Sequence, residues 1–514
     1  FASFESSNSY PSYFSVKGGA IYGNSVELNN NGDVTFTGNS AYINASSTRS
    51  SGSAFGGAIY VTNDLSIQNN DFVLFSGNTE SDSSGDRMRC IYVEGGTVFL
   101  SAAAGNRIEF RDSVYIGSAS TVKLNDEYSY QDADGRTVTV KQQGDILFIG
   151  ANCPTEVYTM TNLYGGRLRV EDGTVYQGYG ITAHAGSEST VRVKDSWLEH
   201  AGCDLIFNAG TTLELAGQNI VHGDVQMEAG STLSFHYDSN QRSQAAMTLT
   251  GNLTLEGTYH ILVNGYEGQI GAYKLITIDE GEVTGWDYRS LCLNSRSREI
   301  ISPEDYLRWV DNSLYYSESS RWSSTVWTNA AGNGQWDNGL GTLHSNTALM
   351  NVKFSANEGE SVKLVGSLLV DSMTVEQGGR YTYTAGNAST RLRVVEDLRV
   401  EAGASADIQL GDGVRVDGEL LSSGELKVSK VTGEGSMYID GGILELADDT
   451  DALAVEGSVY IDGAELRGNW TGTGLSIGTS SVAAGAEVTL HDVEITSELV
   501  NDGSLNLGGQ VTVQ

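Results

Sequence analysis

Gly18-Gly19-Ala20-Ile21-Tyr22, followed after a polar interval by Phe36-Thr37-Gly38-Asn39, recurs as Gly56-Gly57-Ala58-Ile59-Tyr60 and Phe75-Ser76-Gly77-Asn78. The two copies begin 38 residues apart, and a third glycine pair, Gly95-Gly96, begins 39 residues after the second. Self-similarity at a fixed period of this size is typical of solenoids, in which each structural unit stacks on the next. Since half of such a unit has the length of a short rung, each copy is expected to form two rungs of a coil.

Within each copy the apolar residues alternate with polar ones, as in Val34-Thr35-Phe36 and Leu65-Ser66-Ile67. This alternation indicates short strands with one face turned inward. The glycine pairs supply corners, and the phenylalanine and asparagine are expected to stack on their copies as an aromatic ladder and an amide ladder. The residues that define this structural repeat are Gly18, Gly19, Phe36, Asn39, Gly56, Gly57, Phe75 and Asn78.

The composition of the chain favours β structure and excludes some partners. Its 514 residues include 63 glycines and only 3 prolines, whereas helices need longer stretches free of glycine. The formal net charge of -35, spread along the chain, would repel nucleic acid and anionic membrane surfaces. No apolar run is long enough for a transmembrane helix, so no membrane insertion is predicted for these residues.

Beyond the repeats, short alternating segments bounded by glycine continue, for example Thr211-Thr212-Leu213-Glu214-Leu215. Few tight two-residue turns separate them, which favours parallel stacking over hairpins. We therefore predict an all-β protein with a right-handed parallel β-helix fold, a β-solenoid of two coil segments. The predicted parts are an N-terminal β-helix over 1–285, an aromatic-rich junction over 286–340, and a C-terminal β-helix or β-solenoid over 341–514.

The junction holds five of the seven tryptophans, and a helical turn is expected at Ser302-Pro303-Glu304-Asp305. The regular strand spacing after residue 341 also suits a β-sandwich; the recurrent short segments bounded by glycine favour a second coil. At the two ends, the first residue Phe1 suggests a removed leader or a trimmed sequence. The strand-like ending at Gln514 suggests that more chain follows or that something docks there.

The four cysteines, Cys90, Cys153, Cys203 and Cys292, have no zinc-type spacing. Two disulfides are possible, but bridges would have to join adjacent rungs, and these spacings skip several. Buried free thiols are therefore favoured.

Motifs for catalysis or metal binding are weak. Gly474-Leu475-Ser476-Ile477-Gly478 matches the nucleophile pattern GxSxG, which functions only as a strand-to-helix elbow, and β-like sequence follows it. Asp132-Ala133-Asp134-Gly135 resembles the centre of a calcium loop, but Lys141 stands where the bidentate glutamate would be. Asp448-Asp449-Thr450-Asp451 is a second acidic loop. We predict no catalytic residue, no metal site and no cofactor.

The GGAI element followed by FxxN resembles the tandem signature of the polymorphic outer membrane protein family. The resemblance covers about the first quarter of the chain; the third unit departs from it, with Gly95-Gly96-Thr97-Val98 and Phe110-Arg111-Asp112-Ser113. The exported passengers of that family are autotransporter-like β-helices implicated in adhesion, so the resemblance implies a β-helix at the bacterial outer surface.

Three functions are therefore considered. The first is an extracellular or cell-surface adhesin or stalk that binds a protein or glycan ligand of a host cell or neighbouring cell through projecting loops and lateral faces. The second is a fibre subunit whose partner is itself, by end-to-end or lateral association. The third is a polysaccharide-degrading β-helix enzyme; the absence of a catalytic constellation favours a protein that is not an enzyme.

Overall fold

The computed structural model describes residues 14–42, 52–82, 85–131, 134–151, 153–200, 204–237, 244–265, 272–294, 306–317, 324–326, 333–337, 349, 351–355, 359–449 and 452–513. All the regular secondary structure in these ranges consists of β-strands. The chain divides into two compact units, the first comprising Phe1–Tyr266, Lys274–Glu304 and Asp311–Leu314, and the second comprising Glu267–Tyr273, Asp305–Val310 and Tyr315–Gln514.

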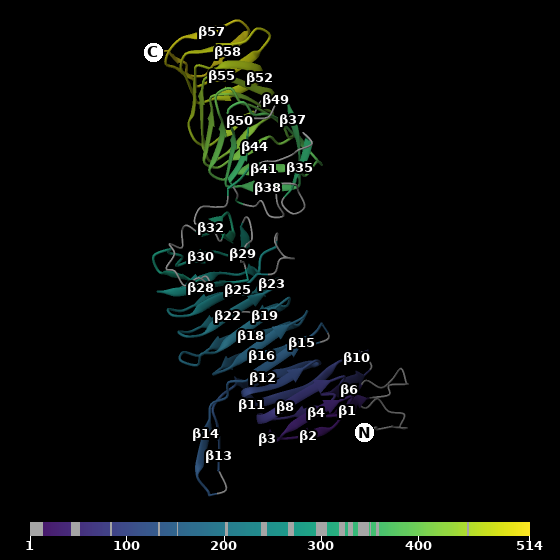
Figure 1. Cartoon of the computed structure of the whole chain (residues 1–514). Helices are drawn as coiled ribbons and strands as arrows, with labels where there is room; N and C mark the ends of the chain where they lie inside the picture. Colours follow the sequence, from purple (N-terminus) through teal and green to yellow (C-terminus); the bar gives the residue numbers. More distant parts are fainter. Residues whose placement is uncertain are drawn as a thin grey trace. The chain divides into compact units, whose positions relative to one another are not determined.

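The first unit is a parallel β-helix with three faces, in which each rung pairs in register with the next (Figure 1). One face, called here face C, contains β4 (Asp33–Thr37), β8 (Leu65–Ser76), β11 (Arg89–Phe110), β15 (Asp145–Ile149), β17 (Arg167–Glu171), β19 (Thr190–Lys194), β22 (Thr212–Ala216), β25 (Thr232–His236), β28 (Tyr259–Asn264) and β31 (Leu291–Asn294). The parallel pairing shows the predicted solenoid fold.

The other two faces, A and B, share the long strands β11, β12 (Ser113–Leu124), β16 (Thr155–Leu163) and β18 (Val175–Ala183), which pass round the corner between them, whereas β8 belongs to faces B and C. Face A adds β2 (Ile21–Gly23), β7 (Ile59–Val61), β20 (Trp197–His200), β23 (Asn219–His222), β26 (Met247–Thr250) and β29 (Tyr273–Glu280). Face B adds β3 (Val26–Asn29), β21 (Leu205–Phe207), β24 (Val225–Met227), β27 (Leu253–Leu255) and β30 (Val283–Thr284).

The core of this coil consists of columns of equivalent apolar residues. On face C the register places one buried aliphatic residue directly on the next in the column Val73, Ile108, Ile146, Leu168, Val191, Leu213, Leu233, Ile261 and Leu293. Each such side chain contributes roughly 1.5–3 kcal/mol by its removal from water. The alternation in the sequence thus becomes a continuous narrow core.

The phenylalanines of the repeat form a second column beside the first. Phe36 stacks on Phe75 with ring centroids 4.9 Å apart, Phe75 on Phe110 at 5.1 Å, and Phe110 on Phe148 at 4.8 Å. Their interplanar angles are 4°, 13° and 12°. The fourth member, Phe148, lies outside the two clean copies of the repeat.

The asparagines of the repeat form a hydrogen-bonded ladder at the adjoining corner. The side-chain oxygen of Asn78 accepts hydrogen bonds from the backbone and side-chain nitrogens of Asn39, at 3.1 and 2.8 Å. The side-chain nitrogen of Asn78 donates to Phe36 O at 2.9 Å and to Asp112 Oδ2 at 2.8 Å. Asp112 thus takes the place of an asparagine in the third unit, one position earlier than the FxxN spacing.

Each glycine of a pair is required for a different reason. Gly56 has a φ of +65°, which side chains rarely adopt. A Cβ on Gly57 would lie 2.5 Å from the backbone nitrogen of Thr79 and 2.6 Å from the carbonyl oxygen of Arg89. The pair therefore marks a corner where the backbone of a neighbouring rung leaves no room for a side chain.

The prediction of two rungs per repeat unit was wrong, because each unit forms a single rung. Ile21 pairs directly with Ile59, and Ile59 with Ile91. The remaining residues of each unit leave the coil to form a side layer of β1 (Phe14–Lys17), β6 (Gly52–Phe55), β5 (Ser40–Tyr42), β9 (Thr79–Asp82) and β10 (Gly85–Arg87). Val16, Ala41 and Ala54 form a small core in this layer.

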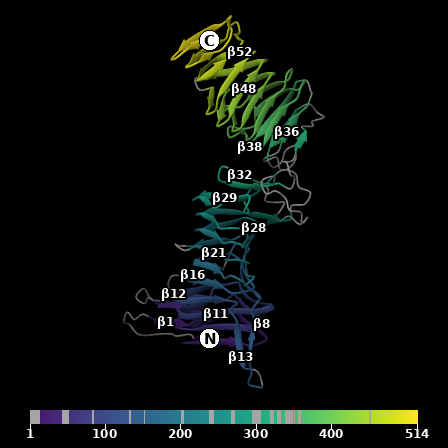
Figure 2. The ribbon, with the colours of Figure 1, turned by 90° about the vertical axis from the view of Figure 1, so that its left-hand side faces the viewer.

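A hairpin also leaves the coil, between β12 and β15. Strands β13 (Tyr128–Gln131) and β14 (Thr137–Val140) pair with each other antiparallel. Figures 1 and 2 both show the hairpin projecting beyond the rungs of the first unit.

The second unit is also a stack of parallel rungs, which excludes the β-sandwich alternative for the described part of 341–514. One sheet contains β34 (Ser324–Val326), β36 (Asn351–Phe354), β39 (Ser372–Val375), β42 (Asp397–Val400), β45 (Glu419–Ser422), β48 (Ser436–Asp440), β51 (Val459–Asp462), β53 (Leu475–Ile477), β56 (Glu494–Ile495) and β59 (Thr512–Val513). The second contains β35 (Asn333–Asp337), β37 (Glu360–Val365), β40 (Arg380–Ala385), β43 (Ser405–Gln409), β46 (Glu425–Val428), β49 (Ile443–Asp449), β52 (Glu465–Thr473), β54 (Ser480–Val482) and β57 (Leu499–Asn501), with β55 (Glu487–His491) and β58 (Ser504–Gly508) beside them. The third contains β38 (Ser367–Val370), β41 (Arg391–Val394), β44 (Val414–Val416), β47 (Val431–Gly433) and β50 (Leu453–Val455).

The described part of 286–340 includes β32 (Leu307–Val310) and β33 (Ser313–Tyr316). The first coil extends past residue 285, since β31 pairs in parallel with β28. The expected helical turn at 302–305 lies outside the described residues, as do Trp322 and Trp327. The division into three parts remains a prediction.

We expect Gly57→Ala to destabilise the first unit by about 1–3 kcal/mol, because the new Cβ would displace the backbone of the neighbouring rung. Urea unfolding followed by circular dichroism measures the change. Gly32→Ala is the matched control, since its Cβ would meet only a carboxylate oxygen of Asp71 at 3.8 Å. Equal effects of the two substitutions would contradict this account of the glycine pair.

Candidate interaction faces

The described residues contain no group of three or more His, Cys, Asp or Glu side chains placed to hold a metal ion. Nor do the described residues include a helix long and apolar enough to cross a membrane. The candidate functional features are therefore the outer faces of the coils and the elements that project from them.

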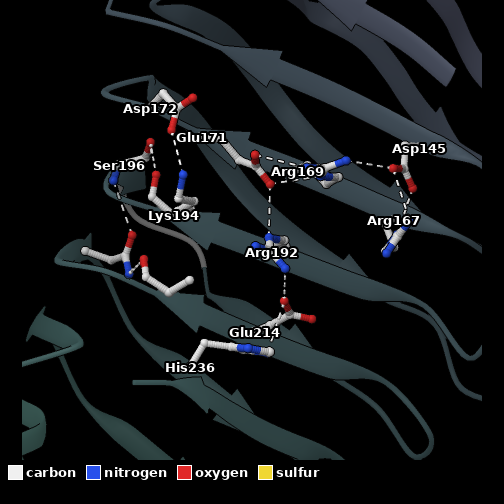
Figure 3. Close-up of polar contacts among 12 residues, drawn as sticks. Asp145, Arg167, Arg169, Glu171, Asp172, Arg192, Lys194, Ser196, Glu214 and His236 are labelled. Carbon is white, nitrogen blue, oxygen red and sulfur yellow. Dashed lines mark hydrogen bonds and ion pairs between the residues drawn. The ribbon is translucent and has the colours of Figure 1, made fainter. Parts of the chain in front are cut away.

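A ladder of alternating charges crosses the outer side of face C (Figure 3). It runs from Asp145 on β15 through Arg169 and Glu171 on β17 to Arg192 on β19 and Glu214 on β22. The nitrogen–oxygen distances are 2.9 Å for Arg169–Asp145, 2.8 Å for Arg169–Glu171 and 3.0 Å for Arg192–Glu171, and Arg192 also pairs with Glu214. Five side chains on four successive rungs thus form one ion-pair network.

Two more residues extend the ladder. Arg167 pairs with Asp145 at 2.7 Å, and the ring of His236 on β25 lies 3.3 Å from Glu214. Burial lowers the pKa of Arg169, but its hydrogen bonds to Glu171 and Asp145 outweigh burial and raise the pKa above its ordinary value. The three arginines balance the three acids, so this strip is close to neutral on a strongly acidic chain.

A buried ion pair joins the side layer to face A. Arg89 lies 2.8 Å from Glu80 and 3.0 Å from Glu156, and the Glu80 side chain is only 1% exposed. The guanidinium also lies over the rings of Tyr92 and Tyr115, 5.9 and 5.2 Å from their centroids. Because a buried carboxylate without its partner is strongly destabilising, this pair ties the side layer to the coil.

Tyrosines form a column under and beyond the side layer. Tyr22, Tyr60, Tyr92 and Tyr115 stack in turn at centroid distances of 5.5, 5.4 and 4.3 Å. Burial is the main cause that raises the pKa of Tyr92 to about 12. Tyr158 continues the column in a tilted orientation and is 42% exposed.

Exposed tyrosines are the main apolar feature of the described surface. Six of the ten exposed large hydrophobic residues are tyrosines, namely Tyr22, Tyr42, Tyr130, Tyr158, Tyr179 and Tyr460. Tyr158 and Tyr179 lie at the same irregular point of the β16–β18 pairing, between Val157↔Gly178 and Met160↔Gly180. Tyrosine offers both an apolar ring and a polar hydroxyl, which suits recognition of proteins and sugars.

The sequence motifs for chemistry find no support in the described structure. Leu475, Ser476 and Ile477 form strand β53, which is followed by strand β54, so GxSxG is not an elbow before a helix. Asp132 and Ala133 lie outside the described residues, as do Thr450 and Asp451 of the second acidic loop.

Cys90 and Cys153 are free and fully buried, as expected for these two positions. Burial raises the pKa of the Cys90 thiol well above its ordinary value and that of Cys153 to about 12, so both are protonated near neutral pH. Cys292 is free but exposed, so the expectation of a buried thiol was wrong at this position. Its side chain lies on the outward side of β31, between the buried Leu291 and Leu293. Cys203 lies outside the described residues.

His200 is an unusual member of the core. It is 7% exposed, and neither ring nitrogen has a hydrogen-bond partner in the described part of the chain. Its Nδ1 lies 3.6 Å from the Cβ position of Gly178 on the rung below, and the Tyr176 ring lies 3.3 Å from the same position. Burial lowers the pKa of His200 to about 4.

The repeat residues predicted from the sequence are brought together at the start of the first coil, where they act as a structural core and corner. The charge ladder, the side layer and His200 were not identified from the sequence. The alternating charges of Arg167, Arg169 and Glu171 indicate an ion-pair strip on one strand. Their partners on other rungs could not be predicted, because the spacing between rungs is irregular and the strand register does not follow from the sequence.

We expect Arg192→Met to lower the free energy of unfolding of the first unit by about 1 kcal/mol at low salt, because two partly buried carboxylates lose their shared partner. A double-mutant cycle with Glu214→Gln measures the coupling. Lys194→Met is the control, since Lys194 and Asp172 are 40% and 49% exposed. Equal losses for Arg192 and Lys194, or no coupling, would contradict a stabilising ladder.

The stability of the first unit should also depend on pH, because His200 is buried. Because the pKa of His200 falls from its ordinary 6.5 to about 4 on folding, the unfolded chain binds more protons between these pH values. The free energy of unfolding should therefore fall as the pH drops through this window, by about 3 kcal/mol in total from this one group.

His200→Leu should remove that part of the pH dependence, measured as the difference from the original chain in urea midpoints at several pH values. His260→Gln, on the outer side of β28, is the control. A pH dependence unchanged in His200→Leu would rule out the buried neutral imidazole as its source.

Comparison with protein families finds a match for a short stretch near the start of the chain. The family model of the Chlamydia polymorphic membrane protein repeat matches residues 33–62, which run from β4 through the side layer and the second glycine pair to the end of β7. No curated protein and no solved structure matches the chain. The chain thus carries, at residues 33–62, a match to the Chlamydia polymorphic membrane protein repeat.

Proposed function

We propose that this chain is the passenger-like part of a bacterial cell-surface protein and acts as an adhesin or stalk. The observation that carries the proposal is the match to the polymorphic membrane protein repeat, which runs from face C of one rung of a parallel β-helix to face A of the next. That repeat is typical of outer-membrane surface proteins, which supports a cell-surface location in general terms.

The outer faces of the coils supply the means of binding. Stacked rungs present long lateral faces, and identical contacts repeated along them give avidity without any single strong site. The first unit carries the projecting hairpin and five of the six exposed tyrosines. The partner is a protein or glycan on a host or neighbouring cell surface.

Self-association is the second candidate, because exposed apolar side chains occur on the late rungs of the second unit. Val500 is 44%, Leu507 47% and Val513 69% exposed. Such side chains favour lateral or end-to-end contacts between copies.

We expect beads coated with the purified chain to attach to cultured epithelial cells, and an excess of free chain to abolish attachment by competition. Tyr158→Ser combined with Tyr179→Ser should reduce attachment several-fold if the corner between faces A and B makes the contact. Tyr460→Ser, an equally exposed tyrosine of the second unit, is the matched control. Attachment no better than that of albumin-coated beads would refute the adhesin proposal.

Sedimentation velocity over a wide concentration range distinguishes the second candidate. An adhesin of this kind should remain a single species at all concentrations. Growth to larger species that Leu507→Ser and Val513→Ser suppress would make self-assembly the primary function.

A further inference from the structure

A small cavity lies where the β13–β14 hairpin joins the first coil. It has a volume of about 240 Å³, and polar residues from both ends of the hairpin line it. Asp126 and Glu127 precede β13, Lys141 and Gln142 follow β14, and Tyr164 and His184 come from the next two rungs. The cavity therefore exists because the hairpin is inserted into a rung.

The walls of the cavity are held in place by their own contacts. Asp126 Oδ2 accepts a hydrogen bond from Lys123 at 3.0 Å, and Asp126 Oδ1 accepts one from the backbone nitrogen of Glu127 at 2.9 Å. The rings of Tyr164 and His184 stack with centroids 4.3 Å apart and an interplanar angle of 3°. His184 Nε2 lies 3.1 Å from Asn162 Oδ1.

Other polar groups on the walls have no partner among the described residues. The carboxylate of Glu127, the ammonium of Lys141 and the hydroxyl of Tyr164 make no hydrogen bond or ion pair there. Gln142 is 1% exposed, and its side-chain oxygen is buried without a hydrogen-bond partner. Buried polar groups are normally satisfied, so an orphan acceptor beside a polar cavity indicates a missing donor.

The hairpin is itself fixed against the first rung of the coil. The side-chain nitrogen of Asn30 donates a hydrogen bond to the hydroxyl of Tyr128 at 2.5 Å. Tyr128 and Tyr130 stack at 5.9 Å, and Tyr130 is 36% exposed. Tyr128 follows the cavity-lining residue Glu127 directly in the sequence, so the first strand of the hairpin carries aromatic rings from its first residue.

We propose that this hairpin-base cavity binds one uncharged sugar ring of a cell-surface glycan. A sugar presents hydroxyl groups that both donate and accept, which matches the mixture of carboxylate, ammonium, phenol and amide on the walls. The cavity is smaller than the roughly 300–1,000 Å³ typical of drug-sized ligands, which fits a single ring. The inference rests on the proposed adhesin function and names its ligand class.

The charge of the walls selects against acidic sugars. Lys123 neutralises Asp126, and Lys141 is the one positive group among the lining residues, opposite Glu127, so the walls offer no surplus positive charge to an acidic sugar on a chain of net charge -35. Burial lowers the pKa of His184 below its ordinary value, against the opposing effect of Asp126, so the imidazole is neutral near pH 7. A uronic or sialic acid would bring a further negative charge into this site.

The test is saturation-transfer NMR followed by calorimetric titration of the whole chain with glucose, galactose, N-acetylglucosamine and N-acetylgalactosamine. Glucuronic acid and N-acetylneuraminic acid form the acidic arm. At least one neutral sugar should bind, and Tyr164→Phe and Glu127→Gln should each weaken it about tenfold. Tyr164→Phe keeps the ring stacked on His184 and removes only the hydroxyl, so it should fold normally.

Glu199→Gln on β20, away from the cavity, is the matched control and should bind as the original chain does. Binding of acidic sugars alone, no binding of any neutral sugar, or neutral binding that the cavity variants leave unchanged would overturn the proposal.

Cell attachment separates this inference from the adhesin proposal. If the cavity variants attach normally and no sugar binds the original chain, the cavity proposal fails and the adhesin proposal stands. If a neutral sugar binds in the cavity but coated beads do not attach, the adhesin proposal fails and the cavity assignment stands.

Discussion

In-register parallel pairing is the constraint on which the whole structure depends. Each rung lies about 4.8 Å above the last, and a given position on one rung faces the same position on the next. A side chain must therefore be compatible with its own counterpart rather than with an arbitrary neighbour. Aliphatic groups, aromatic rings and amides satisfy this condition, and the first coil uses each of them in a separate column.

Charged side chains do not satisfy it, because like charges placed directly opposite repel. The ladder on face C resolves the conflict by alternation within and between rungs. Arg169 and Arg192 are register partners of like charge, yet Glu171 lies between them and pairs with both. Acidic side chains elsewhere on the chain accept backbone hydrogen bonds at corners, as Asp195 does from Gln218 and Asp224 does from Asn252.

The rungs of the coil could be predicted from the sequence, whereas the side layer and the hairpin that leave the coil could not. Alternation such as Val34-Thr35-Phe36, together with the glycine pairs, predicts strands, corners and a solenoid. The side layer escaped prediction because the polar residues between Asn39 and Gly56 have no pattern that separates a second rung from a layer beside the first. One 38-residue unit therefore has the length expected for two rungs, although it forms only one rung and part of the side layer.

The candidate sites depend on contacts between rungs whose spacing is irregular. Asp145 and Arg167 are neighbours because β15 pairs with β17, a fact that requires the hairpin over 128–140 to be excluded from the rung. The same insertion creates the cavity beside Gln142. Burial of His200 likewise depends on a glycine one rung below, which the sequence does not align with it.

The asparagine ladder of the repeat has a direction and an end. A side-chain amide has an oxygen that accepts and a nitrogen that donates, so an asparagine can bond to its counterparts on both neighbouring rungs. The side-chain nitrogen of Asn39, for example, donates to the side-chain oxygen of Asn78. A carboxylate only accepts, and Asp112 receives bonds from Gly77 and Asn78 without passing any on. The carboxylate of Asp112 in the third unit therefore ends the amide ladder after two asparagines, at the rung where the sequence departs from the repeat.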